Sequence, residues 1–152
     1  MNWENQKTPE QILFEERQDF INKNYPFKES EYNQQDIINN SLDGLDVIEK
    51  KDKNNEIEGL ITFYIANDHE NIKYMSIGVI LVREDLQNER IAMNLLKKLL
   101  GVALNNNCEY ITAIADTQAG NDFLRKNGFD YETDPINSRE HLRYELMESI
   151  FN

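Results

Sequence analysis

The spacing of hydrophobic positions changes along the chain, and the first stretch has the period of a helix. Thr8, Pro9 and Gln11 predict its start, because Thr caps a helix, Pro suits the first turn and Gln completes a capping box. Pro26 then marks its end. A second, weaker helix is predicted from Glu31 to Asn40. One face of the first helix collects Leu13, Phe14, Arg17, Phe20 and Ile21, four of them apolar.

From about residue 45 the pattern becomes that of strands. The third predicted strand ends in the run from Ile77 to Val82, which is apolar on both faces and is typical of a central strand covered on two sides. Gly78 inside this run predicts a bulge, or a close approach by another backbone or a ligand. The three strands predicted here are Leu45–Lys50, Ile57–Ala66 and Ile72–Val82, separated by polar turns at Lys51–Asn55 and Asn67–Asn71.

The second half of the chain alternates between helices and strands. The order α-α-β-β-β-α-β-α-β-β, a meander followed by a β-α-β unit, predicts an α+β (mixed α/β) fold with a mixed sheet. Gly128 is of the residue type expected just beyond a helix end. The predicted elements are an amphipathic helix Arg90–Asn105, a strand Tyr110–Ala115, a helix Gln118–Asn127 and two strands, Phe129–Thr133 and Leu142–Ile150.

Length and composition are those of one folded domain. The chain has 152 residues, of which 39% are hydrophobic and 29% charged, enough for a core of its own. No internal repeat and no linker rich in Pro or Gly divides it, so we expect a single domain over residues 1–152.

Net charge bears on which partners are expected, and cysteine content bears on which compartment is expected. A net charge of −12 argues against nonspecific nucleic-acid binding, which needs clustered Lys and Arg. Cys108 is the only cysteine, so no internal disulfide can form, and a free thiol fits a reducing compartment. No apolar run is long enough to cross a membrane and no signal pattern begins the chain, so a cytoplasmic protein without a membrane partner is expected.

The most informative segment is the change from strand to helix after Val82. A buried strand ends there, a short polar turn follows, and a long helix begins near Arg90. The free amides at a helix start, together with the helix dipole, favour anions such as phosphate or pyrophosphate.

This segment resembles the signature of the GNAT superfamily of N-acetyltransferases, Gln/Arg-x-x-Gly-x-Gly/Ala. The first and last positions match the signature, whereas Arg90 replaces its central Gly and Glu89 places a negative charge at an anion site. Arg90 either obstructs the backbone cradle or binds phosphate itself. The six positions are filled here by Gln87, Asn88, Glu89, Arg90, Ile91 and Ala92.

The resemblance continues downstream, in a helix that ends in Gly128-Phe129. Counting back from this pair places Gln118 at the family's Asn position, Gly120 at its Ala position and Leu124 at its Tyr position, with Phe123 before it. Gln118 is either a helix cap or a cofactor contact. Together the two motifs identify a stretch from about residue 45 to residue 150 as similar to this family, which implies a mixed sheet with helices on both faces.

The resemblance also implies a site and a reaction. In the family, acyl-CoA lies where two parallel strands splay apart, here Tyr74–Val82 and Tyr110–Ala115, and Gly78 would mark the start of the splay. The backbone of Ile80, Leu81 and Val82 would pair with the pantetheine arm of acetyl-CoA. An amine of a small molecule or peptide would then attack the thioester.

The catalytic groups stay open at this point. Leu124 cannot donate the proton that the family's Tyr gives to the thiolate, and no acidic residue lies between Tyr74 and Val82. Polar groups near the expected cleft are Tyr74, Ser76, Tyr144, Glu109 and Asp116, and none of them can be assigned a role.

Two functions therefore compete. One is an N-acetyltransferase, whose acceptor contacts are expected in Asn22–Glu31 and Asp134–Glu140. The other is a catalytically inactive relative that binds or regulates, which Arg90, Glu89 and Leu124 favour. The last strand could also pair with a second copy, so a homodimer is one possible assembly.

Overall fold

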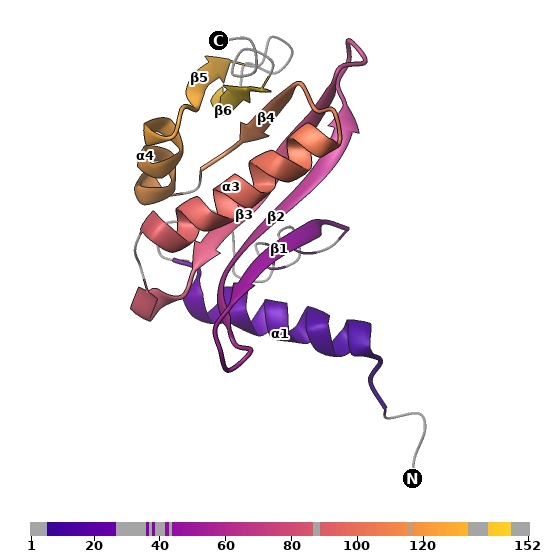
Figure 1. Ribbon diagram of the computed structural model, residues 1–152, viewed down its shortest axis with the longest axis vertical. Helices are drawn as coiled ribbons and strands as arrows, with labels where there is room; N and C mark the ends of the chain where they lie inside the picture. The colour runs from indigo at the N-terminus through magenta and orange to yellow at the C-terminus, as the bar shows by residue number, and fades with distance from the viewer. Residues whose placement is uncertain are drawn as a thin grey trace.

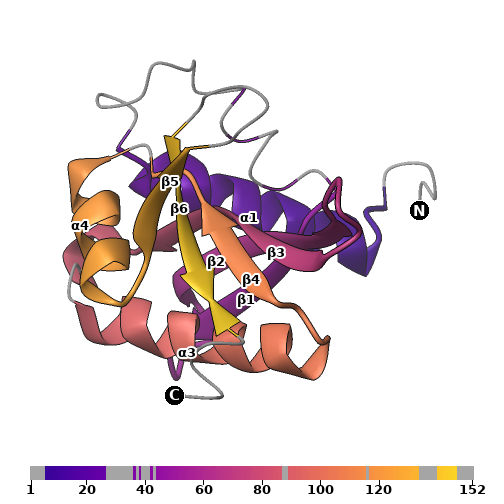
Figure 2. The same cartoon turned by 90° about the horizontal axis from the view of Figure 1, so that it is seen from above.

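The structure is a computed structural model in which a six-stranded mixed sheet carries helices on both faces (Figures 1 and 2). Helix α1 covers one face, and α3 and α4 cover the other. This confirms the predicted fold class. The residues that the structure describes are 6–26, 36, 38, 42, 44–86, 89–115, 117–133 and 140–146.

Helix α1 (Pro9–Asn24) begins as its sequence predicts. The Gln11 amide donates to the Thr8 hydroxyl at 3.1 Å, and the Thr8 amide donates to the Gln11 side chain at 2.8 Å, which completes the capping box. Of the weaker helix predicted at residues 31–40, only Asp36 and Ile38 are described, and both are helical; the others lie outside the described residues. Ile38 is buried in the core that α1 forms with the sheet.

The sheet has the strand order β1-β2-β3-β4-β6-β5. Neighbouring strands are antiparallel except for β3 and β4, which are parallel and joined by a crossover through α3. The last strand thus lies between two earlier ones. The bounds are β1 (Asp46–Lys51), β2 (Ile57–Asn67), β3 (Lys73–Val82), β4 (Tyr110–Ala113), β5 (Asp130–Thr133) and β6 (Glu140–Glu145).

Two hydrophobic cores lie on either side of the sheet. Helices α3 (Glu89–Asn105) and α4 (Gln118–Lys126) pack over the larger core, where Leu95, Leu99, Met75 and Ile111 are fully buried. The smaller core joins α1 to β2 and β3. Strand β3 contributes to both cores, so the prediction of a central strand covered on two sides is confirmed.

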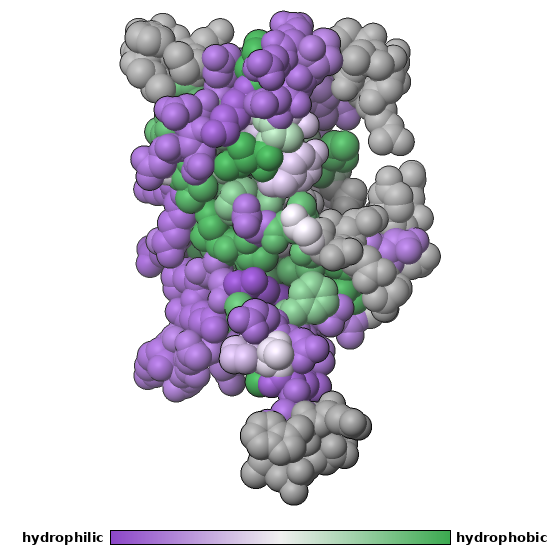
Figure 3. All heavy atoms as spheres, turned by 90° about the vertical axis from the view of Figure 1, so that its right-hand side faces the viewer, coloured by the Kyte–Doolittle hydropathy of each residue, from purple (hydrophilic) through white to green (hydrophobic). Residues whose placement is uncertain are grey.

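One side of the molecule carries a group of apolar side chains on its surface (Figure 3). Seen from this side, apolar side chains gather in the middle of the face, and hydrophilic ones occupy its ends. Val47 and Ile48 of β1 are only half-buried. Among the described residues, no helix combines the length and apolarity that a membrane span requires.

The last strand lies partly where it was predicted, but it begins and ends earlier in the chain. It was expected at residues 142–150, but β6 begins at Glu140 and ends at Glu145. Its pairing with β4 ends at Tyr110, the first residue of β4, so no partner strand continues beyond that point. Leu146 is already helical, and its amide donates to the Glu109 carbonyl at 3.0 Å. Residues 147–150 lie outside the described part of the chain.

Candidate acyl-CoA site

The parallel strands β3 and β4 separate part-way along the sheet. Their pairing covers Tyr74–Ile77 on β3 and Tyr110–Ala113 on β4. Beyond Ile77, β3 continues toward α3, whereas the chain after β4 turns off toward α4 (Figure 1). Strand β4 therefore ends two residues earlier than predicted, and Ile114 is 60% exposed because it has left the sheet. Among the described residues, no strand pairs with this edge of Gly78–Val82.

The backbone direction in the last part of β3 is fixed by two hydrogen bonds. The amides of Val79 and Arg83 donate to acceptors on β2 at 3.0 Å and 2.7 Å. Peptide groups along a strand point alternately to its two edges. Those of Ile80 and Val82 therefore face the edge that β4 has left, whereas that of Leu81 points toward β2. Of the three backbone positions predicted to bind ligand, two face the opening.

A bulge in β3 lies where the opening begins. Thr62 of β2 is opposite Val79 and Phe63 is opposite Ile77, so Gly78 is the extra residue, as its position in the sequence predicts. The Val79 amide bonds to the Thr62 hydroxyl in place of a carbonyl. The bulge also changes the alternation of side chains, so that Ile77 packs toward α3 and Val79 toward α1.

The chain passes from β3 through a short 3-10 turn, η3 (Glu84–Leu86), into the start of α3. Gln87 and Asn88 of the predicted motif lie outside the described residues. Glu89 is the first helical residue, and its backbone is described but its side chain is not. The helix therefore begins within the motif, and the amides of its first turn belong to the segment predicted to bind an anion.

The remaining three residues of the motif differ in how far they are exposed to solvent. Arg90 is exposed, Ile91 is buried in the larger core, and Ala92 is half-buried against it. A Cβ atom on Gly59 of β2 would lie 3.1 Å from Ile91 and 3.0 Å from Leu95. This glycine brings the beginning of α3 unusually close to the sheet.

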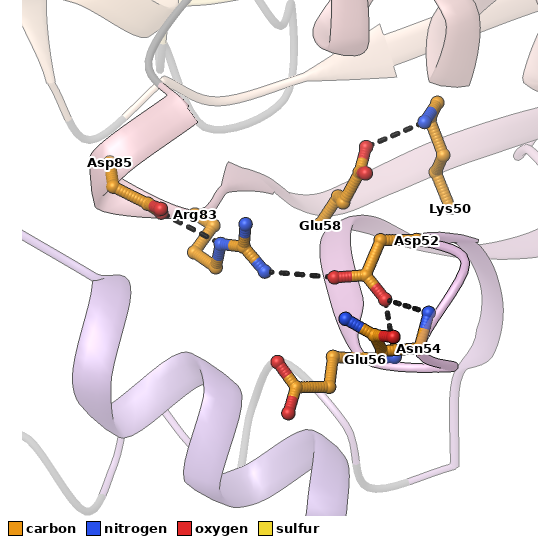
Figure 4. A network of polar contacts seen from close by, with 7 residues as sticks. All are labelled: Lys50, Asp52, Asn54, Glu56, Glu58, Arg83 and Asp85. Carbon is orange, nitrogen blue, oxygen red and sulfur yellow. Dashed lines mark hydrogen bonds and ion pairs between the residues drawn. The ribbon is translucent and has the colours of Figure 1, made fainter.

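Arg83 ties the segment before α3 to the β1–β2 turn (Figure 4). Its guanidinium contacts Asp85 at 2.7 Å and Asp52 at 3.4 Å, and the hydrogen bond from Arg83 to Asp85 is the main cause of its raised pKa. Asp52 also accepts the amides of Asn54 and Glu56 at 2.8 Å and 3.1 Å. The Glu56 amide is the main cause of the lowered pKa of the Asp52 carboxyl.

Two further contacts surround this segment. The Glu84 amide donates to the Asn24 side chain at the end of α1, at 2.8 Å. Lys50 and Glu58, on the neighbouring strands β1 and β2, form an ion pair at 2.5 Å (Figure 4). The turn before α3 is thus held from α1 and from the β1–β2 hairpin.

The start of α4 differs from its prediction. Thr117 caps the helix, because its hydroxyl accepts the Gly120 amide at 3.0 Å, so Gln118 is not the cap. The Gln118 amide group instead donates to Asp122 at 2.7 Å, on the exposed side of the helix.

Phe123, predicted as a cofactor contact, and Leu124, at the family's Tyr position, both lie against the core. Leu124 is buried in the larger core. Phe123 is half-buried and packs on the same core. Gly128 ends the helix with a φ of 99°, a conformation that favours glycine, and Phe129 follows as a buried residue.

A tyrosine stack occupies the first half of β3, on the face opposite α3. Tyr74 and Tyr110 are parallel with ring centroids 5.3 Å apart, and Tyr64 meets Tyr74 edge-on at 6.3 Å. The Arg143 guanidinium lies 3.7 Å from the Tyr110 ring centre. Tyr110 donates its hydroxyl proton to Asp68 at 2.6 Å. No local pattern along the chain predicts this cluster, because its members meet only once the strand register is known.

The surroundings of the tyrosine stack raise the pKa of Tyr74 and lower the pKa of the neighbouring Asp68 carboxyl. Burial is the main cause that raises the pKa of Tyr74 to about 12, so its hydroxyl stays protonated at neutral pH. The hydrogen bond from Tyr110 is the main cause of the lowered pKa of the Asp68 carboxyl. Asp68 also accepts the amides of Glu70 and Ile72, both at 2.9 Å, so this carboxylate is engaged in structural contacts.

The remaining polar candidates are not brought together. Ser76 is half-buried on the face of the tyrosine stack, whereas Tyr144 packs against Phe129 on the opposite face, at 5.3 Å between ring centroids. Glu109 precedes β4, at the end away from the opening. Asp116 lies outside the described residues. Among the residues that are described, no group of His, Cys, Asp and Glu could hold a metal ion.

Solved structures with this fold include several acetyltransferases. A GNAT-family acetyltransferase from Staphylococcus aureus Mu50 has a TM-score of 0.66 and 18% identity, over 90% of this chain and 94% of that one. The ribosomal-protein-S18-alanine N-acetyltransferase from Escherichia coli has a TM-score of 0.65 and 12% identity, over 92% of each chain. The NatC complex bound to Gag peptide and CoA has a TM-score of 0.59 and 15% identity, over 86% and 87%.

At these identities the structural likenesses establish the fold alone, and no curated protein sequence matches the chain. The sequence itself matches the family model described as "Acetyltransferase (GNAT) family" over residues 10–129. That match covers most of the chain, from α1 to the residue after Gly128. The chain belongs to the acetyltransferase (GNAT) family.

Proposed function

We propose that the protein is an N-acetyltransferase that moves the acetyl group of acetyl-CoA to an amine of a small molecule or peptide. One observation carries the proposal: β4 does not pair with the edge of β3 from Gly78 to Val82, and this part of β3 leads through the turn η3 toward the start of α3. A pantetheine arm could pair with the Ile80 and Val82 backbone there as an added strand would.

The two ends of this edge suit the two ends of the donor. The amides that begin α3 favour the pyrophosphate, and the bulge at Gly78 lies where a thioester would reach the end of the parallel pairing. Membership of the GNAT family supports acyl-CoA as the donor. The NatC structure with CoA bound shows that a protein of similar fold accepts this molecule.

The reaction needs few groups from the protein. The neutral amine nitrogen attacks the thioester carbon, a C–N bond forms and the C–S bond breaks. The amine loses one proton to a base, and the thiolate leaves with its electron pair. Because Leu124 offers no proton, the thiolate of CoA would leave unaided or take its proton from water. A water molecule, rather than Tyr74, would accept the amine proton, since the Tyr74 hydroxyl is already protonated.

The proposal is tested by measuring thiol release from acetyl-CoA with a panel of primary amines and peptide N-termini. We expect at least one amine to raise thiol release well above the rate with acetyl-CoA alone. Mass spectrometry of the acceptor should show one added acetyl group for each thiol released. Folded protein that turns over none of these amines would contradict the proposal.

A catalytically inactive relative that binds CoA or a regulatory partner is the second candidate. The burial of Leu124 in the core favours it, because no proton donor can occupy that position without repacking. Calorimetry with acetyl-CoA and CoA separates the two candidates: tight binding without turnover supports the inactive relative. Arg90→Gly tests the motif, since affinity should rise if Arg90 obstructs the cradle and fall if Arg90 binds phosphate.

A further inference from the structure

Thr62 has an unusual environment on β2. Its side chain is polar, yet 0% of its surface is exposed. Its hydroxyl accepts the Val79 amide at 3.0 Å. A buried amide without a partner is costly, so this hydroxyl supplies an acceptor that the bulge would otherwise lack.

The bulge is packed tightly against the same side chain. A Cβ atom on Gly78 would come within 2.4 Å of the Thr62 hydroxyl oxygen and within 2.9 Å of Leu45. The extra residue is therefore accommodated only because it has no side chain. Thr62 and Gly78 therefore depend on each other. The Thr62 hydroxyl accepts the Val79 amide of the bulge, and Gly78 has no side chain that would collide with that hydroxyl.

The bulge sets the direction of the backbone beyond it. One extra residue reverses which peptide groups face each edge of the strand. With the bulge, the Ile80 and Val82 peptides face the opening, and the Val79 and Leu81 peptides face β2. Without it, the two sets would exchange places, and the peptide groups that face the opening would shift by one residue.

We infer that Thr62, which lies on a different strand from the opening, is a positioning residue for acyl-CoA. Its hydroxyl holds the bulge that aims the Ile80 and Val82 peptides at the pantetheine arm. This inference rests on the proposed function. The side chain itself would not touch the donor, because it is buried on the β2 side of β3.

The test compares Thr62→Val, which removes the hydroxyl at nearly constant shape, with Thr62→Ser, which keeps it. We expect Thr62→Val to weaken acetyl-CoA binding in calorimetry by about tenfold, since one buried hydrogen bond and the aim of the backbone are lost. Thr62→Ser should bind within about threefold of wild type. The KM for the amine should change much less than the KM for acetyl-CoA.

Ile61→Val is the matched control. Ile61 is the neighbouring residue of β2, is equally buried and faces the other core, so its loss of a methyl group lowers stability without touching the bulge. Acetyl-CoA affinity should therefore be retained in Ile61→Val. Hydrogen exchange gives a readout without ligand: the Val79 amide should exchange faster in Thr62→Val than in wild type or Thr62→Ser.

The outcomes separate this inference from the proposed function. Wild-type protein that does not bind acetyl-CoA would overturn the proposed function, while the exchange measurement would still report whether Thr62 holds the bulge. Wild-type binding with unchanged affinity in Thr62→Val would overturn the inference alone. Equal loss of affinity in Thr62→Val and Ile61→Val would also overturn it, because a general loss of stability would then account for both.

Discussion

The two halves of β3 differ in their neighbours. Tyr74–Ile77 is paired on both edges, with β2 and β4, and carries the tyrosine stack. Gly78–Val82 is paired with β2, and among the described residues no strand lies along its other edge; it leads through η3 toward α3. The change occurs at one inserted residue, Gly78. In the proposed function, a single strand therefore serves stability in one half and ligand binding in the other, with a bulge between the two halves.

The largest expected effect comes from placing proline at two neighbouring positions of Gly78–Val82, the open half of β3. The amides at these two positions point to opposite edges of the strand. Leu81→Pro removes an amide that points toward β2 and should leave the protein largely unfolded. Ile80→Pro removes an amide that faces the opening, so a folded protein with at least about tenfold weaker acetyl-CoA binding is expected. Circular dichroism and calorimetry measure the two properties.

Ile80→Ala is the control for that comparison, because it shortens the same side chain and keeps the amide. It should lose much less affinity than Ile80→Pro. If both proline variants unfold to the same extent, the assignment of peptide directions along this half of β3 is wrong.

An intermediate effect is expected when buried side chains of the two halves are shortened. Met75, in the paired half, is fully buried, so Met75→Ala should lower the free energy of unfolding by about 2–5 kcal/mol. Ile80, in the open half, is half-buried, and Ile80→Ala should cost about 1 kcal/mol. Urea unfolding at constant pH measures both values. Equal losses would show that the open half is as well packed as the paired half.

The smallest effect concerns acid stability in the paired half. Because the pKa of the Asp68 carboxyl is lowered from 3.8, this group stabilises the fold above that pH, and the contribution is lost as pH falls through the folded value. Tyr110→Phe removes the main cause of the shift. The variant should therefore lose less stability than wild type on acidification below about pH 4, as followed by the urea midpoint. A parallel decline in the two proteins would argue against this contact.

Local signals were enough to predict many elements of the fold. The capping residues of α1, the apolar run of β3 and Gly128 after α4 each act within a few residues of their position, and each prediction is confirmed. The bulge at Gly78 was also predictable, because a glycine inside an apolar strand weakens the strand and is typical of a bulge.

Features that depend on how neighbouring strands align could not be predicted from the amino-acid sequence. Thr62 resembles any other strand threonine until the structure places it opposite the bulge. Tyr64, Tyr74 and Tyr110 are far apart in sequence and meet because three strands align. The early end of β4 has the same origin, since a strand ends where its neighbour diverges, whatever its own residues favour.

The place of β6 in the sheet has a consequence for how the chain acquires its structure during synthesis. Among the described residues, β5 pairs only with β6, although it is made first. When β5 leaves the ribosome it has no strand to join, and it must wait until residues 140–145 follow. Strands β1 to β4 can assemble earlier with α3. We therefore expect nascent chains that stop near residue 133 to hold a four-stranded sheet with an uncovered edge, which is where chaperones or aggregation would act.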